Sequence, residues 1–178
     1  MAARPAPEIF DVTLERAGAR AVPVLRRLMQ LYLYDLGTID GWHISPDGRF
    51  GNRRRIERFW RERGRRSFFI RVGAVLAGFA LIHNRAHFAG AGTHEISEFF
   101  VLRKYRRRGV GRQAAVRLFD MFPGRWEIAE LASNAGAQAF WREVIAGYTR
   151  GEFEDTERTD GDWRGRVQGF RAVGPGSR

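Results

Sequence analysis

The sequence contains no cysteine among its 178 residues. Disulfide bonds, thiolate metal sites and a cysteine nucleophile are therefore excluded. No stretch approaches the roughly 20 consecutive apolar residues that a membrane-spanning helix needs, and residues 1–7 carry no apolar signal core. From these absences we expect a cytoplasmic protein with no membrane partner.

Lysine is almost as scarce. Lys104 is the only lysine, so 30 of the 31 basic residues are arginines, and the net charge is +11. The arginines are spread along the chain rather than gathered in one block, which is typical of solvated surfaces and argues against nucleic-acid binding as the main function. The charge does favour an anionic ligand. A hydrophobic fraction of 44%, with 14 Phe and 5 Trp, indicates one folded domain over residues 1–173 and a disordered tail over 174–178.

The spacing of apolar residues predicts strands that alternate with helices. We expect strands over 8–16, 67–72, 74–84, 95–102, 126–131, 149–153 and 165–173, and helices over 22–36, 53–63, 113–122 and 134–145. Residues 37–51 carry Gly, Asp, Ser and Pro and are expected to form a loop. This order predicts an α/β fold with about four helices and a mixed six- to seven-stranded sheet, antiparallel in its N-terminal part and parallel in the middle.

One segment carries a clear chemical signal. Arg106-Arg107-Arg108-Gly109-Val110-Gly111-Arg112, the basic glycine turn, lies between an apolar strand and an amphipathic helix. The first N–H groups of a helix have no partner within the helix, and its dipole attracts negative charge there. Glycine lets the backbone approach a phosphate closely. Four arginines in this turn indicate an anion with several charges.

Two common phosphate motifs do not explain this turn. The P-loop pattern GxxxxGK[ST] is absent. Gly109, Gly111 and Ala114 satisfy the weak dinucleotide pattern GxGxxA, with Glu130 near the distance of the acidic partner. In dinucleotide-binding folds, however, that turn opens the first βαβ unit, whereas here it follows four expected strands and two helices. A nicotinamide-dependent enzyme is therefore the weaker interpretation.

A third pattern explains more of the chain. Arg106-x-x-Gly109-x-Gly111 is similar to the [Q/R]-x-x-G-x-[G/A] pyrophosphate motif of the GNAT superfamily of acyl-CoA-dependent N-acyltransferases. The preceding strand, Glu95-Ile96-Ser97-Glu98-Phe99-Phe100-Val101, also resembles that family. Asn134-x-x-Ala137-x-x-Phe140-Trp141 resembles its N-x-x-A-x-x-[FL]-Y helix. The resemblance covers about residues 67–173, and the order of elements covers the whole chain.

The resemblance implies a GNAT fold in which the central parallel strands splay apart beyond Val101. Acetyl-CoA, the co-substrate, would lie in the gap, with its pantetheine pairing with exposed strand backbone and its pyrophosphate on the N–H groups of residues 107–112. Asn134 would either cap its helix or bind the pantetheine arm. The cofactor-binding residues implied are Phe100, Val101, Arg106, Arg107, Arg108, Gly109, Val110, Gly111, Arg112, Asn134 and Trp141.

The implied reaction is direct attack of a primary amine on the thioester, which needs a base but no covalent nucleophile and no metal. Glu95 is the first candidate for the base and Glu98 the second. Their odd separation predicts that they lie on opposite faces of the sheet. For either residue the alternative is a solvated or salt-bridged carboxylate. His94 is expected to be a surface histidine at the start of the strand.

The family's usual acid is a tyrosine on the last helix, and Trp141 stands at that position. An indole cannot protonate a thiolate at a useful rate, so Trp141 would wall the CoA channel or lie in the core. Tyr148 would replace the acid if the helix extends that far. Otherwise the thiolate would take its proton from solvent or from the product ammonium. The missing tyrosine also leaves open a non-catalytic acyl-CoA-binding or nucleic-acid-binding module on the same fold.

The acceptor amine, of a small molecule or a protein, would bind among the first helices, their loop and the last hairpin. Residues 31–35 and Trp42-His43 supply aromatic and acidic candidates there. Asp35 or Asp40 would bind a cationic amine, and the alternative is that they cap turns while Tyr32 and Tyr34 lie partly in the core. Some family members pair their final hairpins, so a homodimer is compatible with the resemblance.

Overall fold

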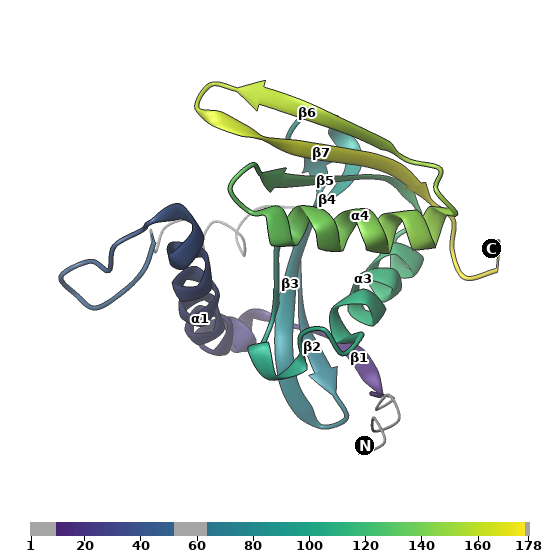
Figure 1. Cartoon of the computed structure of the whole chain (residues 1–178). Coiled ribbons are helices and arrows are strands. Elements are labelled where there is room, and N and C mark those ends of the chain that lie inside the picture. Colours follow the sequence, from purple (N-terminus) through teal and green to yellow (C-terminus); the bar gives the residue numbers. More distant parts are fainter. Residues whose placement is uncertain (1–9, 52–63, 177–178) are drawn as a thin grey trace, which may run out of the picture.

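The computed structural model describes residues 10–51 and 64–176. One seven-stranded sheet runs through the molecule in the order β1-β2-β3-β4-β5-β7-β6 (Figure 1). The strands are β1 (Val12–Arg16), β2 (Arg66–Val72), β3 (Val75–Ala86), β4 (Gly90–Val101), β5 (Gly124–Leu131), β6 (Glu154–Asp160) and β7 (Trp163–Ala172). The expected mixed α/β sheet is therefore confirmed.

The described residues form three α-helices: α1 (Val22–Asp40), α3 (Val110–Met121) and α4 (Ala135–Thr149). The helix expected over 53–63 lies outside the described residues. Apolar residues of α3 and α4 pack on one face of the sheet, around Phe119, Trp126 and Trp141. Apolar residues of α1 pack on the other face, against Phe79 and Phe100. Within the described ranges, no helix combines the length and the hydropathy that a membrane span needs.

The sheet opens in its middle. Among the described strands, β4 and β5 are the parallel pair, and they are joined by only three pairs of residues, the last of which is Glu95 with Glu127. β4 continues to pair with β3 as far as Val101, and β5 with β7 as far as Leu131. The two strands therefore separate immediately after Glu95 and Glu127. The expected splay is confirmed, although it begins earlier than Val101.

Several boundaries differ from those expected, each for a local reason. α1 continues through Gly37 and ends at Gly41, whose φ of 68° stops the helix. α4 extends to Thr149, so the strand expected over 149–153 is wrong, and the charged residues between form β6 itself. α3 begins at Val110, inside the basic glycine turn, because the buried Val110 side chain fixes the first turn in the core.

A β-bulge in β4 changes which way its side chains point. Leu81 of β3 pairs with Glu98, whereas the next residue, Ile82, pairs with Ile96, so Ser97 is an extra residue in β4. An extra residue breaks the alternation of faces. Glu95 and Glu98 therefore lie on the same face, the one that carries α1, and the expectation of opposite faces is wrong.

Candidate active site

The basic glycine turn connects the end of β4 to the start of α3. Arg107 and Gly109 both have left-handed backbones, with φ of 56° and 79°. Gly109 is the N-cap of α3, and the first helical hydrogen bond runs from Gln113 N–H to the Gly109 carbonyl over 3.0 Å. Backbone N–H groups that follow such left-handed residues converge on a concave surface that binds anions. The geometry of this turn fits a pyrophosphate.

The second glycine of the motif has a packing role. A Cβ at Gly111 would lie 3.2 Å from the Phe140 ring of α4 and 3.7 Å from Phe99 of β4. The absence of a side chain therefore lets α3 approach α4 and the edge of the splay closely. Val110 beside it is fully buried, so its backbone is the part of this residue that can contact a ligand.

Arg106, the first residue of the motif, braces the turn. Its Nε donates to the Val101 carbonyl over 2.6 Å, and its guanidinium lies 5.4 Å above the Phe100 ring. A guanidinium nitrogen of Arg106 also pairs with Asp35 of α1, which Arg103 contacts as well, over 2.7 Å. Arg106 thus joins β4, the turn and α1.

The other three arginines of the turn have exposed side chains. Arg108 stacks on Phe10, with its Cζ 4.9 Å from the ring centre. Arg112 of α3 lies against Gly147 of α4, where a Cβ would meet its guanidinium at 2.8 Å. Together with Arg107 they give the mouth of the turn a positive charge, which suits a ligand with several phosphates.

Of the two β4 residues expected to present their backbone to the splay, Val101 does so and Phe100 does not. Leu102 N–H donates to the Ala77 carbonyl of β3, and the Phe100 carbonyl lies against Gly78 of β3. Because backbone groups alternate in direction along a strand, the open side is presented by Phe99 and Val101. Phe100 instead turns its backbone to β3 and its side chain to the α1 face.

Glu95 lies at the last paired position before the strands separate. His87 N–H donates to its Oε2 over 2.6 Å, and His83 Nε2 lies 3.8 Å from its Oε1. Burial, the largest cause, raises the pKa of Glu95 to about 7, and the neighbouring Glu127 charge adds to this rise. A carboxyl with this pKa takes up and releases protons near neutral pH, as a general base must.

Glu98 shares the α1 face with Glu95 because of the bulge at Ser97. It therefore lies further into the splay on the same side of the sheet, opposite Leu81 of β3. Both glutamates face the side that α1 covers, so both remain candidates for contact with an acceptor.

His94, on the opposite face, is not the surface residue that the sequence suggested. Its ring packs at a tilt against Trp126, 5.1 Å away, and against Phe122, 5.8 Å away. Burial and the nearby Arg66 charge lower the pKa of His94.

Glu127 is the residue that sequence reasoning missed. It is only 4% exposed, and its two carboxylate oxygens accept hydrogen bonds from Phe88 N–H over 2.9 Å and Ala89 N–H over 2.8 Å. It lies beside Glu95 in the β4–β5 pairing. The sequence signal was a glutamate within an apolar strand, Trp126 to Leu131, but only the sheet register brings it next to Glu95.

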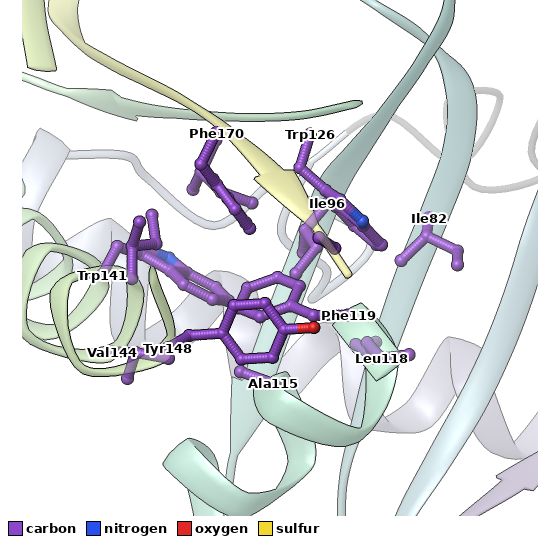
Figure 2. Close-up of a cluster of buried hydrophobic side chains, with 14 of the residues drawn as sticks. Ile82, Ile96, Ala115, Leu118, Phe119, Trp126, Trp141, Val144, Tyr148 and Phe170 are labelled. Atoms are coloured by element: carbon purple, nitrogen blue, oxygen red, sulfur yellow. The ribbon is translucent and has the colours of Figure 1, made fainter. Parts of the chain in front are cut away.

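The two α4 residues that resemble the family motif occupy different environments. Asn134 caps the helix, because its side-chain oxygen accepts from Ala137 N–H over 3.1 Å. Trp141 is 5% exposed and packs edge-on against Phe99, 5.0 Å away. Trp141 is therefore a core residue (Figure 2).

Tyr148 lies on α4, as its proposed role required, but its side chain is part of the core. Its hydroxyl donates to Asp120 Oδ1 over 3.0 Å, and its ring packs on Phe119 and Phe170 in the core (Figure 2). At ~1.5 Å of rise per residue, Tyr148 is about 20 Å along the helix from Asn134. The structure does not bring Tyr148 to the other candidate residues.

The acidic candidates for the acceptor already have partners. Asp35 pairs with Arg103 and Arg106, and Asp40 accepts a hydrogen bond from Ser133 Oγ over 2.6 Å. Tyr32 packs edge-on against Phe79 in the core of the α1 face. Tyr34, Leu31 and Trp42 remain exposed along α1 and the segment after it.

Comparison with known families agrees with this geometry. Residues 27–148 match the Acetyltransferase (GNAT) family model, which covers more than half of the chain, so the chain belongs to the GNAT acetyltransferase family. This family uses acetyl-CoA. A search of curated proteins gave no significant match.

Solved structures of acetyltransferases share the fold at low identity. An acetyltransferase from Thermus thermophilus is 18% identical, with a TM-score of 0.65 over 92% of this chain and 99% of that chain. The ribosomal-protein-S18-alanine N-acetyltransferase from Escherichia coli is 16% identical, with a TM-score of 0.57 over 94% and 97%. The spermidine N-acetyltransferase from Vibrio cholerae, in complex with CoA and spermine, is 10% identical, with a TM-score of 0.60 over 90% and 95%.

Proposed function

We propose that this acetyltransferase transfers an acetyl group from acetyl-CoA to a primary amine by direct attack in a ternary complex. The observation that carries the proposal is the position of Glu95, a partly buried carboxyl with a pKa of about 7 at the point where β4 and β5 separate. A splay between parallel strands, next to the N-terminus of a helix, is where α/β folds bind ligands.

The donor half of the site follows from the basic glycine turn. Its backbone N–H groups, from Arg107 to Arg112, would hold the pyrophosphate, and the exposed arginines would neutralise it. The pantetheine would pair with the open backbone of Phe99 and the N–H of Val101 in β4. Because Arg106 already binds the Val101 carbonyl and Asp35, its role is to hold the turn in shape.

The chemical step requires a neutral amine. Glu95 would remove a proton from the ammonium, directly or through water, and the free amine would then attack the thioester carbonyl. A C–N bond forms and the C–S bond breaks. Solvent takes the proton from the product nitrogen and supplies one to the leaving thiolate, since Trp141 and Tyr148 both lie in the core. Glu98, on the same face, is the second candidate for the base.

The acceptor would enter from the α1 face, where Glu95 and Glu98 are presented. Exposed aromatic and aliphatic side chains of α1 and of the following segment border this side. Because Asp35 and Asp40 have partners, a cationic acceptor would be recognised by the glutamates of β4 instead. Relatives with this fold act on spermidine and on a ribosomal-protein alanine, so small-molecule and protein amines both belong in the test.

The alternative is a chain that binds acyl-CoA without catalysis, which the tryptophan at position 141 favours. Two measurements separate the possibilities. Acetyl-CoA should raise the Tm, whereas NAD and duplex DNA should not. Release of free CoA across a panel of polyamines, aminoglycosides and peptides with free N-termini should then identify an acceptor. No Tm shift with acetyl-CoA would overturn the proposal, and a shift without CoA release from any amine would favour the binding module.

A further inference from the structure

The turn between β3 and β4 binds both carboxylates at the start of the splay. Three consecutive residues take part: His87 N–H donates to Glu95, whereas Phe88 N–H and Ala89 N–H donate to Glu127. The distances are 2.6, 2.9 and 2.8 Å. One short segment thus fixes two neighbouring carboxylates on adjacent strands.

Glu127 is the stronger anchor of this segment. Both of its oxygens accept backbone hydrogen bonds, and its side chain is almost fully buried. Burying a carboxylate is costly unless its oxygens are bonded, and charge-assisted bonds to N–H groups are among the strongest in proteins. The two bonds therefore hold residues 88 and 89 in place, and with them the N–H of His87 above Glu95.

The same segment is tied to the last hairpin. His87 Nε2 lies 2.8 Å from Asp160 Oδ2 at the end of β6, and the Phe88 ring packs 5.2 Å from that of Trp163 on β7. The anchor at Glu127 thus connects Glu95 with the β6–β7 hairpin.

Several charged groups act on Glu95. Burial is the largest cause that raises the pKa of Glu95, and the Glu127 carboxylate adds to this rise, whereas the N–H of His87 and the charges of His87 and Arg65 lower it. His83 of β3 lies opposite Glu95, and Glu98 lies on the same face further along β4. Of these groups, Glu127 is the one that both adds a negative charge beside Glu95 and holds the segment above it.

We propose that Glu127 is a positioning residue for acetyl transfer: its carboxylate anchors the turn between β3 and β4, which in turn holds the His87 N–H against Glu95 at the start of the splay. The inference rests on the proposed function, in which Glu95 is the base. Glu127 itself touches neither substrate in this role and acts through Glu95.

The test uses Glu127→Gln, which has the same size but removes the charge and one of the two acceptor oxygens, because the amide nitrogen cannot accept from Phe88 N–H or Ala89 N–H. We expect the acidic limb of the kcat/KM profile to move down by about one pH unit, because a neighbouring like charge has been removed. The plateau kcat should fall about tenfold because the base is weaker, whereas the KM for acetyl-CoA should stay within twofold of wild type. Glu152→Gln, an exposed glutamate replaced in the same way, should change none of these values.

Direct titration of Glu95 by ¹³C NMR of its carboxyl separates this inference from the proposed function. In Glu127→Gln the midpoint of the Glu95 titration should fall by as many pH units as the acidic limb of the kcat/KM profile does. An unmoved Glu95 midpoint overturns the positioning role even if the enzyme is active. If the Glu95 midpoint moves while the kinetic limb stays in place, Glu95 is not the base, so the proposed function loses its mechanism.

Glu127→Asp keeps the test valid should the Gln variant fail to fold. It retains the charge but shortens the reach to Phe88 and Ala89. Hydrogen exchange at these two amides should become faster and kcat should fall, while the kinetic limb stays closer to that of wild type. Faster exchange with an unchanged kcat would overturn the positioning role.

Discussion

Asp35 of α1 pairs with Arg106, the first residue of the basic glycine turn, and so joins a helix on one face of the sheet to the turn that leads to the other face. Arg103 binds the same carboxylate, whose side chain is only 15% exposed. The sequence suggested Asp35 as a ligand for a cationic acceptor. In the structure its two ion pairs instead join α1 to the basic glycine turn and the residues before it.

This pairing predicts the effect of Asp35→Asn. Two arginines would lose a charged partner, so the free energy of unfolding should fall by about 1–3 kcal/mol. The Kd for acetyl-CoA should rise severalfold because the turn loses its brace, whereas the KM for the amine should not change. Urea unfolding and calorimetry measure these quantities, and Asp162→Asn in the exposed β6–β7 turn is the matched control. An increased amine KM with unchanged acetyl-CoA binding would instead support the acceptor role.

The pKa of Glu95, about 7, predicts the pH dependence of the reaction. Only the ionised carboxylate accepts a proton, so kcat/KM should rise as the pH rises through about 7 and then level off. In Glu95→Gln the rate at pH 8 should fall by about 10²-fold and this limb should disappear. Steady-state kinetics from pH 5.5 to 9 provide the measurement. If Glu95→Gln retains this limb, the general base is Glu98 instead, and the limb should then disappear in Glu98→Gln.

Two roles of Asn134 can be separated by substitution. Asn134→Ala removes the N-cap of α4 and should lower the free energy of unfolding by about 1 kcal/mol. Asn134→Asp keeps a capping oxygen and should restore most of that loss, but it lacks the amide N–H₂ donor. If Asn134 also binds pantetheine, both variants should weaken acetyl-CoA binding. If it only caps the helix, the Asp variant should bind acetyl-CoA as wild type does, as calorimetry would show.

The sequence was most informative where function depends on local geometry. The basic glycine turn and the Asn134 cap are short-range features, since a left-handed glycine and a capping side chain act within a few residues of their positions. The order of elements was sufficient to predict the mixed sheet, because apolar periodicity distinguishes strands from helices.

Features that depend on strand register could not be predicted. The bulge at Ser97 places Glu98 on the same face as Glu95. The residue types in β4 do not predict where such a bulge occurs. Glu127 became a neighbour of Glu95 only through the β4–β5 pairing. Similarly, Arg106 and Asp35 are distant in sequence, so their contact follows from the packing of α1 and not from any local pattern.

The core position of Tyr148 predicts a small effect on catalysis. Tyr148→Phe removes the hydrogen bond to Asp120 and should lower the free energy of unfolding by about 1 kcal/mol. Because the ring is in the core and the hydroxyl is bonded to Asp120, kcat should change less than about twofold. Thermal unfolding and initial rates test both statements. A loss of kcat by a factor of ten or more in a folded variant would make Tyr148 the acid after all.

A buried carboxyl under α4 predicts how stability depends on pH. Glu130 is 5% exposed, and among the described residues neither of its oxygens has a hydrogen-bond partner. Burial, followed by the charge of Asp155, raises the pKa of Glu130 to about 8. The folded protein therefore keeps a proton that the unfolded chain releases near its ordinary pKa of 4.5.

By linkage, this group's contribution to stability is complete below about pH 4.5 and is lost as the pH rises through about 8. Glu130→Gln, which remains neutral, should remove this decline. The variant should therefore gain stability relative to wild type as the pH rises from 5 to 9. For Glu143→Gln, on the exposed side of α4, the free energy of unfolding should depend on pH as it does in wild type. Urea unfolding at intervals across this range measures the slope. Parallel curves for Glu130→Gln and wild type would show that the folded protein ionises Glu130 as readily as the unfolded chain does.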